Sequence, residues 1–133
     1  MPLEIINPEQ LGAPKGYSNG ILTPAGARQL FVSGQVAWDR DQKVVGDSFA
    51  EQFDRALGNV IAVVEKAGGA PDHIARLTIY VLDRKEYLEG IKAVGDAYRR
   101  RMGKHFPAMT LVEVRGLLEA GAKLELEATA AIP

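Results

Sequence analysis

The segment from Ser48 to Gly69 constrains the fold more than any other part of the sequence. Its apolar residues recur at intervals of three and four, the spacing that places side chains on one side of an α-helix. Ser48 stands three residues before Glu51, so the two side chains can cap the first free backbone N–H groups. Gly68 and Gly69 end the pattern. Such a helix has one apolar face, which must pack against another layer of the protein.

Strand-like segments lie on both sides of this helix. Gly and Pro recur through the first 46 residues and break any helical period there. Alternating apolar and polar residues predict strands over 28–38, 73–83, 108–115 and 121–131. A polar run at 39–43 predicts a hairpin turn before Val44, and a second helix is predicted over 84–102 despite Gly90 and Gly95. The pattern therefore predicts an α+β fold in which two helices cover one face of a sheet.

Length and charge limit the classes of function. The chain has 133 residues, enough for a single domain spanning 1–133. Sixteen Lys and Arg against seventeen Asp and Glu leave a net charge of -1, which makes nucleic acid an improbable partner. The absence of cysteine excludes disulfides, thiol nucleophiles and thiolate metal sites. No apolar run is long enough to cross a membrane, and the first residues do not resemble a secretion signal, so a cytoplasmic location is expected.

Several common catalytic and cofactor motifs are absent. His73 and His105 are the two histidines, and neither stands at a metal-ligand spacing, so structural roles are expected. Glycine-rich dinucleotide and nucleoside triphosphate fingerprints are missing, and Ser33 lacks the Gly-x-Ser-x-Gly elbow of a serine hydrolase. The arginine run 99–101 suits the negative end of a helix better than an RNA contact. We therefore expect no metal and no cofactor.

The two faces of the predicted sheet differ in polarity. One face is apolar throughout and is expected to pack under the helices; it comprises Leu30, Val32, Val36, Leu77, Ile79, Val81, Val112, Val114, Leu124 and Leu126. The other face mixes large apolar with charged side chains; it comprises Phe31, Tyr80, Leu82, Met109, Leu111, Ser33, Gln35, Glu113, Arg115, Glu125 and Glu127. Because this face contains several large apolar side chains, it is expected to be buried in an oligomer. A carboxylate buried there would have a raised pKa, as a general acid or base requires.

Four short segments together resemble one known family. They are Gly16-Tyr17-Ser18, Ser33-Gly34-Gln35, Phe106-Pro107-Ala108 and Leu124-Glu125-Leu126-Glu127. In this order and setting they resemble the RidA/YjgF proteins, also called L-PSP endoribonuclease-like, over residues 16–130. The resemblance implies a chorismate-mutase-like fold, with a mixed sheet of about six strands backed by two helices. It also implies a homotrimer with three clefts between subunits.

The resemblance also implies a chemistry. Active members of the family hydrolyse enamine or imine intermediates released by pyridoxal-phosphate enzymes, giving a 2-oxo acid and ammonia without a cofactor. Carried over by position, Tyr17 would border the ligand, Ser33 and Gly34 would line the pocket floor, and Glu127 would orient the attacking water. Two structural alternatives remain open: Tyr17 as a half-buried aromatic, and Glu127 in an ion pair between subunits.

One departure from the family bears on the substrate. Family deaminases have an arginine directly after Pro-Ala, which clamps the substrate carboxylate, whereas Met109 stands here. Gly95 replaces a family asparagine, and Leu111 lies two residues beyond Met109, so the pocket is expected to be unusually apolar. Arg115 is a candidate substitute anchor, and pairing with Glu113 or another surface acid is its alternative role.

Three functions follow as hypotheses. The first is a homotrimeric hydrolase that acts on an imine or enamine less anionic than an amino acid. The second is a non-catalytic trimer that binds a small apolar metabolite in the same clefts. The third is RNA cleavage, against which the neutral charge and the lack of a histidine pair argue.

Overall fold

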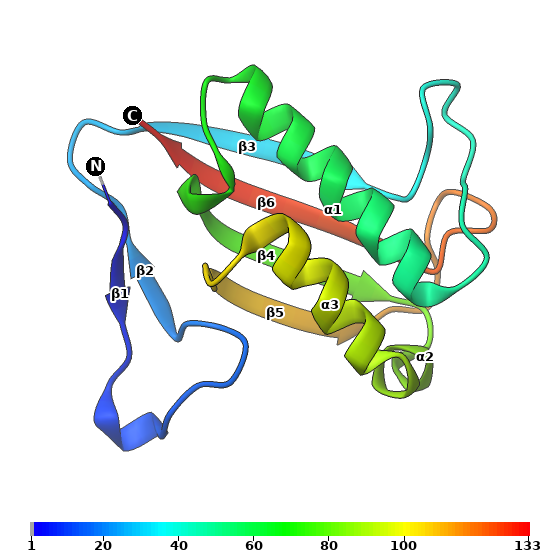
Figure 1. Ribbon diagram of the computed structural model, residues 1–133, viewed down its shortest axis with the longest axis horizontal. Coiled ribbons are helices and arrows are strands. Elements are labelled where there is room, and N and C mark those ends of the chain that lie inside the picture. The colour runs from blue at the N-terminus through cyan, green and yellow to red at the C-terminus, as the bar shows by residue number, and fades with distance from the viewer. Residues whose placement is uncertain (1) are drawn as a thin grey trace.

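The computed structural model describes residues 2–133 and contains a four-stranded main sheet (Figure 1). Its strands run in the order β3 (Arg28–Gln35), β6 (Leu124–Ile132), β4 (Ile74–Val81) and β5 (Ala108–Glu113). β6 pairs antiparallel with both of its neighbours, whereas β5 pairs parallel with β4. The sheet is therefore mixed, as the family resemblance implied.

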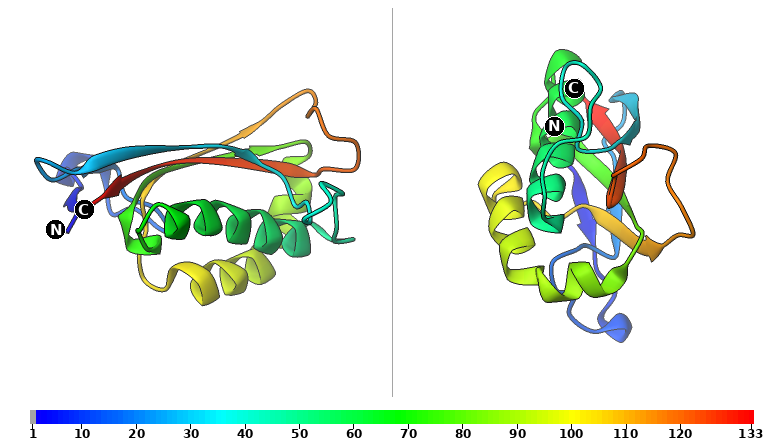
Figure 2. Two further views of the ribbon diagram at one scale, coloured as in Figure 1. Left: turned by 90° about the horizontal axis from the view of Figure 1, so that it is seen from above. Right: turned by 90° about the vertical axis from the view of Figure 1, so that its right-hand side faces the viewer.

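The helices cover one face of this sheet. α1 (Phe49–Lys66) and α3 (Ile91–Met102) lie side by side against it, and the short α2 (Arg84–Glu89) precedes α3. Figure 2 shows all three helices on the same side, with the opposite face of the sheet uncovered. Single 3-10 turns occupy Glu9–Leu11 and Pro71–His73. No helix within residues 2–133 is long and apolar enough to cross a membrane.

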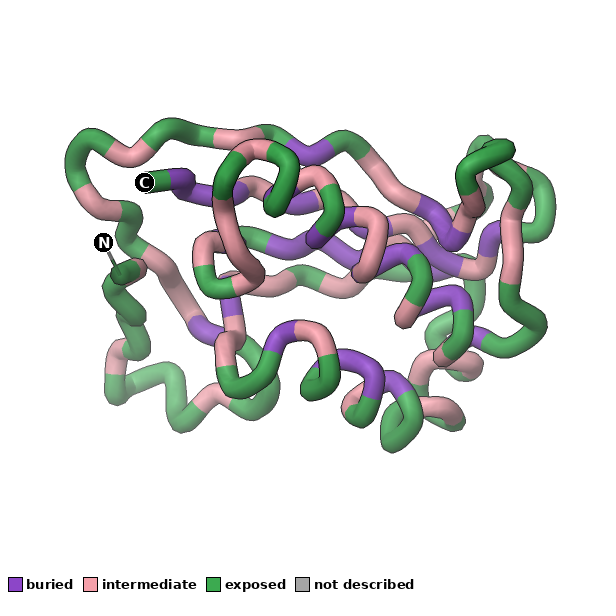
Figure 3. Tube along the Cα trace, turned by 45° about the horizontal axis from the view of Figure 1, so that its top comes forward, coloured by how far each residue is buried: buried purple, intermediate pink, exposed green. Residues whose placement is uncertain are grey.

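The first strands stand apart from the main sheet. β1 (Glu4–Ile6) and β2 (Gly20–Leu22) form a separate antiparallel pair, so the six strands are divided between two sheets. This N-terminal segment is mostly exposed, whereas burial is concentrated in the main sheet and the inner sides of the helices (Figure 3). The N-terminal segment is nevertheless joined to the main sheet, because Ser18 forms a parallel bridge with Ala108 of β5.

The predicted capping box at the start of α1 is confirmed. The Ser48 hydroxyl accepts a hydrogen bond from the Glu51 amide at 3.1 Å, and the Glu51 carboxylate accepts one from the Ser48 amide at 3.3 Å. The apolar stripe of α1 is buried as the spacing predicted; its buried members are Phe49, Phe53, Ala56, Leu57, Val60, Ile61 and Val64. The polar Gln52 is buried beside them, and its side chain bonds to backbone groups of Gly46, Gly121 and Lys123. The helix ends before Gly68, whose φ of 91° suits a residue without a side chain.

Replacing Ser48 with alanine is expected to lower the free energy of unfolding by about 1 kcal/mol, because a first-turn N–H loses its acceptor. Urea denaturation followed by circular dichroism measures this change. Glu51→Gln is the matched control, since glutamine can complete the same box and should cost much less. Equal losses in the two variants would contradict a capping role for the serine hydroxyl.

The second predicted helix is divided in two. α2 ends at Glu89 and α3 begins at Ile91, with Gly90 between them at φ -97° and ψ 12°. Glycine has a low helix propensity, and the chain changes direction at this residue. Gly95, the other weak point in the pattern, lies within α3 and does not interrupt it.

The predicted hairpin after β3 is a compact loop. β3 ends at Gln35, and beyond it Trp38 and Val44 form an isolated antiparallel bridge. Asn59 of α1 holds this loop, because its side-chain amide donates to the carbonyls of Val36 and Trp38 at 3.1 and 3.0 Å. Trp38 is half-buried, and its indole donates to Gln35, in keeping with a packing role.

The predicted assignment of sheet faces is right for β4 and β6, wrong at the end of β3 and wrong for β5. Beyond the register shift in β3, Gln35 lies opposite the buried Leu126 and not on the uncovered face as predicted. Residues of β3, β4 and β6 predicted to face the helices are buried or partly buried in the core. In β5, however, Met109 lies opposite Leu77 and Leu111 lies opposite Ile79, so both side chains face the helices. Val112, predicted to face the helices, lies opposite Tyr80 and is 39% exposed. The sequence of β5 is nearly continuous in apolar residues, which leaves the phase of its alternation undetermined.

Candidate functional site

The main sheet separates the predicted site residues into two groups. Tyr17, Gly95, Met109 and Leu111 line cavities on the side that carries the helices. Ser33 lies in β3, two residues after Phe31, whose side chain is on the uncovered side of the sheet. Glu127 and Phe31 line a hollow on that side. A single chain therefore does not bring the predicted catalytic carboxylate to the predicted ligand-lining residues.

The group on the helix side lines a continuous apolar cleft. A cavity of about 200 Å³ is lined by Tyr17, Met109 and Leu111, among others. A larger one of about 330 Å³ extends between α3 and the sheet, and its wall includes Gly95 and Met109. The two cavities share five lining residues: Lys15, Gly16, Ile79, Tyr87 and Met109. We call the two together the helix-side cleft.

A buried serine, Ser18, fixes the segment that borders the opening of this cleft. Ser18 is 4% exposed; its amide donates to the Pro107 carbonyl at 3.0 Å, and its hydroxyl donates to the Phe106 carbonyl at 2.5 Å. These bonds fix Tyr17 beside the start of β5, with 41% of its surface exposed. Two of the segments on which the family resemblance depends therefore meet in space, although 88 residues separate them.

The wall of the cleft is rich in aromatic rings. Tyr98 stacks on Phe106 with centroids 5.6 Å apart, and Tyr87 meets Phe49 edge to face at 6.1 Å. The Tyr98 hydroxyl donates to the His105 carbonyl at 2.6 Å, and burial raises the pKa of this phenol. Tyr98 thus stays neutral over the physiological pH range and serves the wall as an apolar surface.

Glu127 on the uncovered face is bonded to a tyrosine. The Tyr80 hydroxyl donates to Glu127 Oε1 at 2.5 Å, and Glu127 is half-buried beside a hollow of about 190 Å³. Thr78 and Arg76 line the same hollow. The sequence did not single out Tyr80 as the partner, although both residues were placed on one face. This bond fixes the direction of the carboxylate and leaves its second oxygen free for another donor.

The hydrogen bond to Glu127 raises the pKa of Tyr80 above its ordinary value of 10.0. A raised pKa in the folded state stabilises the protein below about pH 10, and this contribution is lost as pH rises through the folded value. In Glu127→Gln the pKa of Tyr80 should therefore fall toward 10. NMR titration of ring-labelled tyrosine measures this pKa, and the Tyr80→Phe variant assigns the Tyr80 signal. A Tyr80 pKa that is unchanged in Glu127→Gln would contradict the hydrogen bond between the two residues.

The backbone at Gly34 lies close to a second carboxylate. A Cβ atom built on Gly34 would clash with Glu125 Oε2, so a glycine allows Glu125 to pack across β3. The pairing of β3 with β6 shifts register between Val32 and Gln35, which leaves Ser33 and Gly34 out of the regular ladder. At this bulge the Ser33 carbonyl accepts a hydrogen bond from the Gln35 side-chain amide at 3.2 Å.

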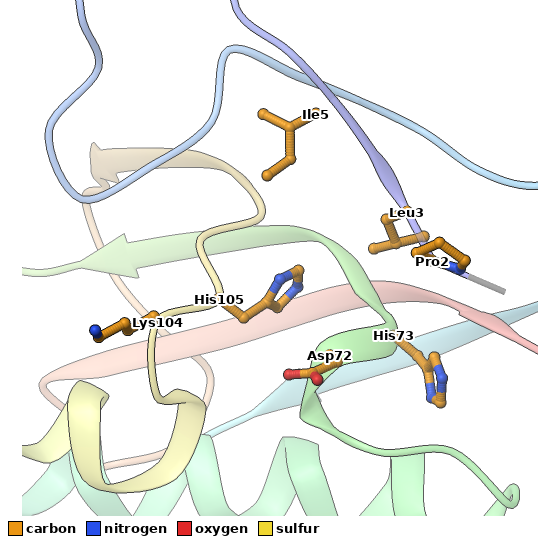
Figure 4. Close-up of a pocket in the computed structure, with 7 residues that line it drawn as sticks. All are labelled: Pro2, Leu3, Ile5, Asp72, His73, Lys104 and His105. Carbon is orange, nitrogen blue, oxygen red and sulfur yellow. The ribbon is translucent and has the colours of Figure 1, made fainter.

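The two histidines line a different pocket, which Figure 4 shows. This pocket has a volume of about 550 Å³ and lies between residues 2–5, the 3-10 turn Pro71–His73 and the segment that follows α3. His105 Nε2 lies 2.7 Å from the Ile74 carbonyl, and His73 Nδ1 accepts from the Ala70 amide at 2.9 Å. Both rings bind backbone groups, as expected for structural histidines. Across residues 2–133, no three His, Asp or Glu side chains are arranged to hold a metal ion.

Arg115 lies away from both groups. It is exposed and follows the end of β5, and it is absent from the walls of the helix-side cleft. Its predicted alternative partner, Glu113, instead accepts a hydrogen bond from the Arg84 amide at 3.0 Å. The structure therefore gives no support to Arg115 as an anchor for a ligand in this cleft.

Comparison with known proteins identifies the family. A family model described as endoribonuclease L-PSP matches residues 8–132. The chain belongs to this family, the RidA/YjgF proteins. Among RidA/YjgF relatives, a RutC family protein of Pyrococcus abyssi is 29% identical over 132 residues, which cover 98% of each chain.

Two further RidA/YjgF relatives bear on fold and chemistry. The crystal structure of a conserved Rid family protein of unknown function, YyfB from Yersinia pestis, superposes with a TM-score of 0.85. It is 28% identical and covers 99% of this chain and 100% of its own. A Salmonella typhimurium protein named 2-iminobutanoate/2-iminopropanoate deaminase is 32% identical over 101 residues, which cover 76% of this chain and 77% of its own. The chain thus has the RidA/YjgF fold throughout.

Proposed function

We propose that the protein is an imine or enamine hydrolase whose active sites form between the subunits of a homotrimer. The separation of the site residues onto two faces of the sheet carries this proposal. A cleft that presents Tyr17 and Met109 from one subunit and Glu127 from its neighbour would unite the two groups. Phe31, which is 74% exposed on the uncovered face of one chain, supports burial of that face against another subunit.

The proposed chemistry is addition of water to a C=N bond. Glu127 accepts a proton from the water as the oxygen attacks the carbon, and it passes this proton to the imine nitrogen, which gives a neutral carbinolamine. The carbinolamine hydroxyl then gives its proton to Glu127, which returns it to the amine, so that the C–N bond breaks, a C=O bond forms and ammonia leaves. Backbone N–H groups at the bulge near Gly34 are the proposed donors to the oxygen, which carries partial negative charge as the hydroxyl loses its proton. No cofactor enters this reaction, and the name of the Salmonella relative supports the reaction class.

Met109 stands where the resemblance implies the carboxylate-binding arginine of the family deaminases. A thioether cannot bind a carboxylate, so a short 2-imino acid whose carboxylate lies against Met109 would leave that charge unpaired, at a cost of several kcal/mol. We therefore propose that the substrate is not one of the short 2-imino acids. The apolar wall of the helix-side cleft supports this proposal.

Ammonia release from freshly generated 2-iminopropanoate tests the role of Met109. The natural protein is expected to accelerate this hydrolysis weakly, and Met109→Arg should raise kcat/KM about tenfold or more, because a charged hydrogen bond to the carboxylate is gained. Met109→Leu is the matched control and should change little. Turnover of the natural protein that equals or exceeds that of Met109→Arg would contradict the proposed substrate preference.

Light scattering after size-exclusion chromatography tests the assembly. A mass three times that of the 14.4 kDa chain is expected. A stable monomer at micromolar concentration would overturn the shared active site, since one chain cannot unite the two groups of residues.

A non-catalytic binding protein of the same fold is the second candidate, and the apolar lining around Met109 favours it. The two candidates differ in one result. A binding protein would leave ammonia release at the spontaneous rate for every imine offered, while still binding the corresponding 2-oxo acids.

A further inference from the structure

The helix-side cleft contains two cationic side chains at its mouth. Lys15 lines both of its cavities, and Arg99 of α3 lines the larger one. Within residues 2–133 Lys15 forms no ion pair, and Arg99 pairs with Asp96 alone. These three charges sum to one positive charge, which suits a ligand with a single carboxylate.

Arg99 lies over a position without a side chain, Gly95, one turn earlier in α3. A Cβ atom built on Gly95 would lie 3.5 Å from Arg99 Nη1 and 3.8 Å from Nη2, so the guanidinium lies over this glycine. Asp96 Oδ1 accepts from Nη2 at 2.5 Å and orients the group. A guanidinium carries five N–H donors, so donors remain for a carboxylate.

Behind these cations lies a space suited to a bulky apolar group. The cavity of about 330 Å³ is within the size range of small-molecule sites. Its apolar wall includes the aromatic residues Phe53, Tyr87, Tyr98 and Phe106, together with Met109. A methyl or ethyl side chain would leave most of this volume unfilled, whereas a phenyl ring would contact several of its aromatic residues.

We propose that Arg99, assisted by Lys15, binds the substrate carboxylate in place of the family arginine, and that the cavity behind it selects an aromatic or large branched side chain. The substrate class is then a 2-imino or enamino acid with a bulky apolar side chain. This assignment depends on the proposed function for the identity of the reacting group. The cationic mouth and the apolar cavity are independent of it.

Binding of stable 2-oxo acids, which are the products of such a reaction, tests this proposal without turnover. Isothermal titration should give a Kd for 2-oxo-4-phenylbutanoate about tenfold or more below that for pyruvate, since only the former fills the apolar cavity. Arg99→Gln should raise the first Kd about tenfold or more. The affinity for neutral 4-phenylbutan-2-one, which lacks the carboxylate, should stay within about twofold in the same variant.

Arg100→Gln is the matched control, because Arg100 is the adjacent residue, is equally exposed at 64%, and does not line the cleft. It should leave both affinities unchanged. An Arg99→Gln variant that binds 2-oxo-4-phenylbutanoate as tightly as the natural protein would overturn the carboxylate assignment. Equal affinity of the natural protein for pyruvate and 2-oxo-4-phenylbutanoate would overturn the side-chain preference.

Gly95→Leu tests the cavity from inside. The position lies within α3 and a Cβ atom there makes only ordinary contacts, so the variant should keep or increase thermal stability. The added side chain should weaken both phenyl ligands about tenfold, and unchanged affinity would place the ligand elsewhere. If the variants change these affinities as expected but the protein hydrolyses no imine faster than the spontaneous rate, the proposed hydrolase function fails. The assignment of Arg99 and the apolar cavity to ligand binding then still stands.

Discussion

Glu127→Gln is expected to lower the rate of imine hydrolysis about 10²–10⁴-fold, the usual contribution of a positioned general base. Glutamine keeps the shape of the side chain and can still accept the hydrogen bond from Tyr80, but it cannot take a proton from water. The measurement is ammonia release from an imine with a bulky apolar side chain. The loss should appear mainly in kcat, since Glu127 is not the group that binds the carboxylate.

Glu65→Gln controls for the change in charge, because Glu65 is an exposed carboxylate on α1 far from the uncovered face. It should leave the rate unchanged. Circular dichroism and light scattering should show the same fold and mass in both variants. Full activity of a correctly assembled Glu127→Gln protein would remove the base from the mechanism.

Leu57→Ala is expected to lower the free energy of unfolding by about 2–5 kcal/mol, among the largest effects available to a single substitution in this chain. Leu57 is 0% exposed and lies in the core between α1 and the sheet, so truncation removes buried apolar surface and leaves a cavity. Urea denaturation gives the value. Leu118→Ala makes the same chemical change at a side chain that is 93% exposed, and it should alter stability by less than about 0.5 kcal/mol. Comparable losses in the two variants would contradict the assigned core.

The sequence predicted correctly those helices and strands whose ends and buried faces depend on residues close together in the chain. The helix after Ser48 has a cap, a continuous apolar stripe and a glycine stop, and the structure contains all three. The second helical segment has a regular stripe too, but its glycines make propensity weak, and the change of direction at Gly90 depends on packing that the pattern does not encode.

The face of β5 could not be predicted, because its orientation is determined by its partner. The strand reads Ala-Met-Thr-Leu-Val-Glu, in which either phase of alternation presents apolar side chains. Parallel pairing with β4, reached through α2 and α3, sets Met109 opposite Leu77. This register moved Met109 and Leu111 to the face opposite Glu127 and made a second subunit necessary to the proposed site.

For the candidate site, the sequence supplied the residue types and the structure supplied their grouping. Tyr17, Gly95, Met109 and Leu111 do lie around one cleft. Arg99 was assigned to a solvated helix end, although its place four residues after Gly95 in a helix is a usable signal for a side chain that covers an open position. The alternation placed Tyr80 on the same face as Glu127. The hydrogen bond between the Tyr80 hydroxyl and Glu127 is apparent only in the structure.

The attachment of the N-terminal segment through Ser18 has an evolutionary consequence. Lys15, Gly16 and Tyr17 form one rim of the cleft, yet they belong to a stretch of chain outside the main hydrophobic core. Substitutions or insertions before Ser18 would therefore change the rim of the proposed ligand site at little cost in folding stability. A fold built in this way could acquire new ligand preferences through changes in residues 15–17, while the sheet and helices stay the same.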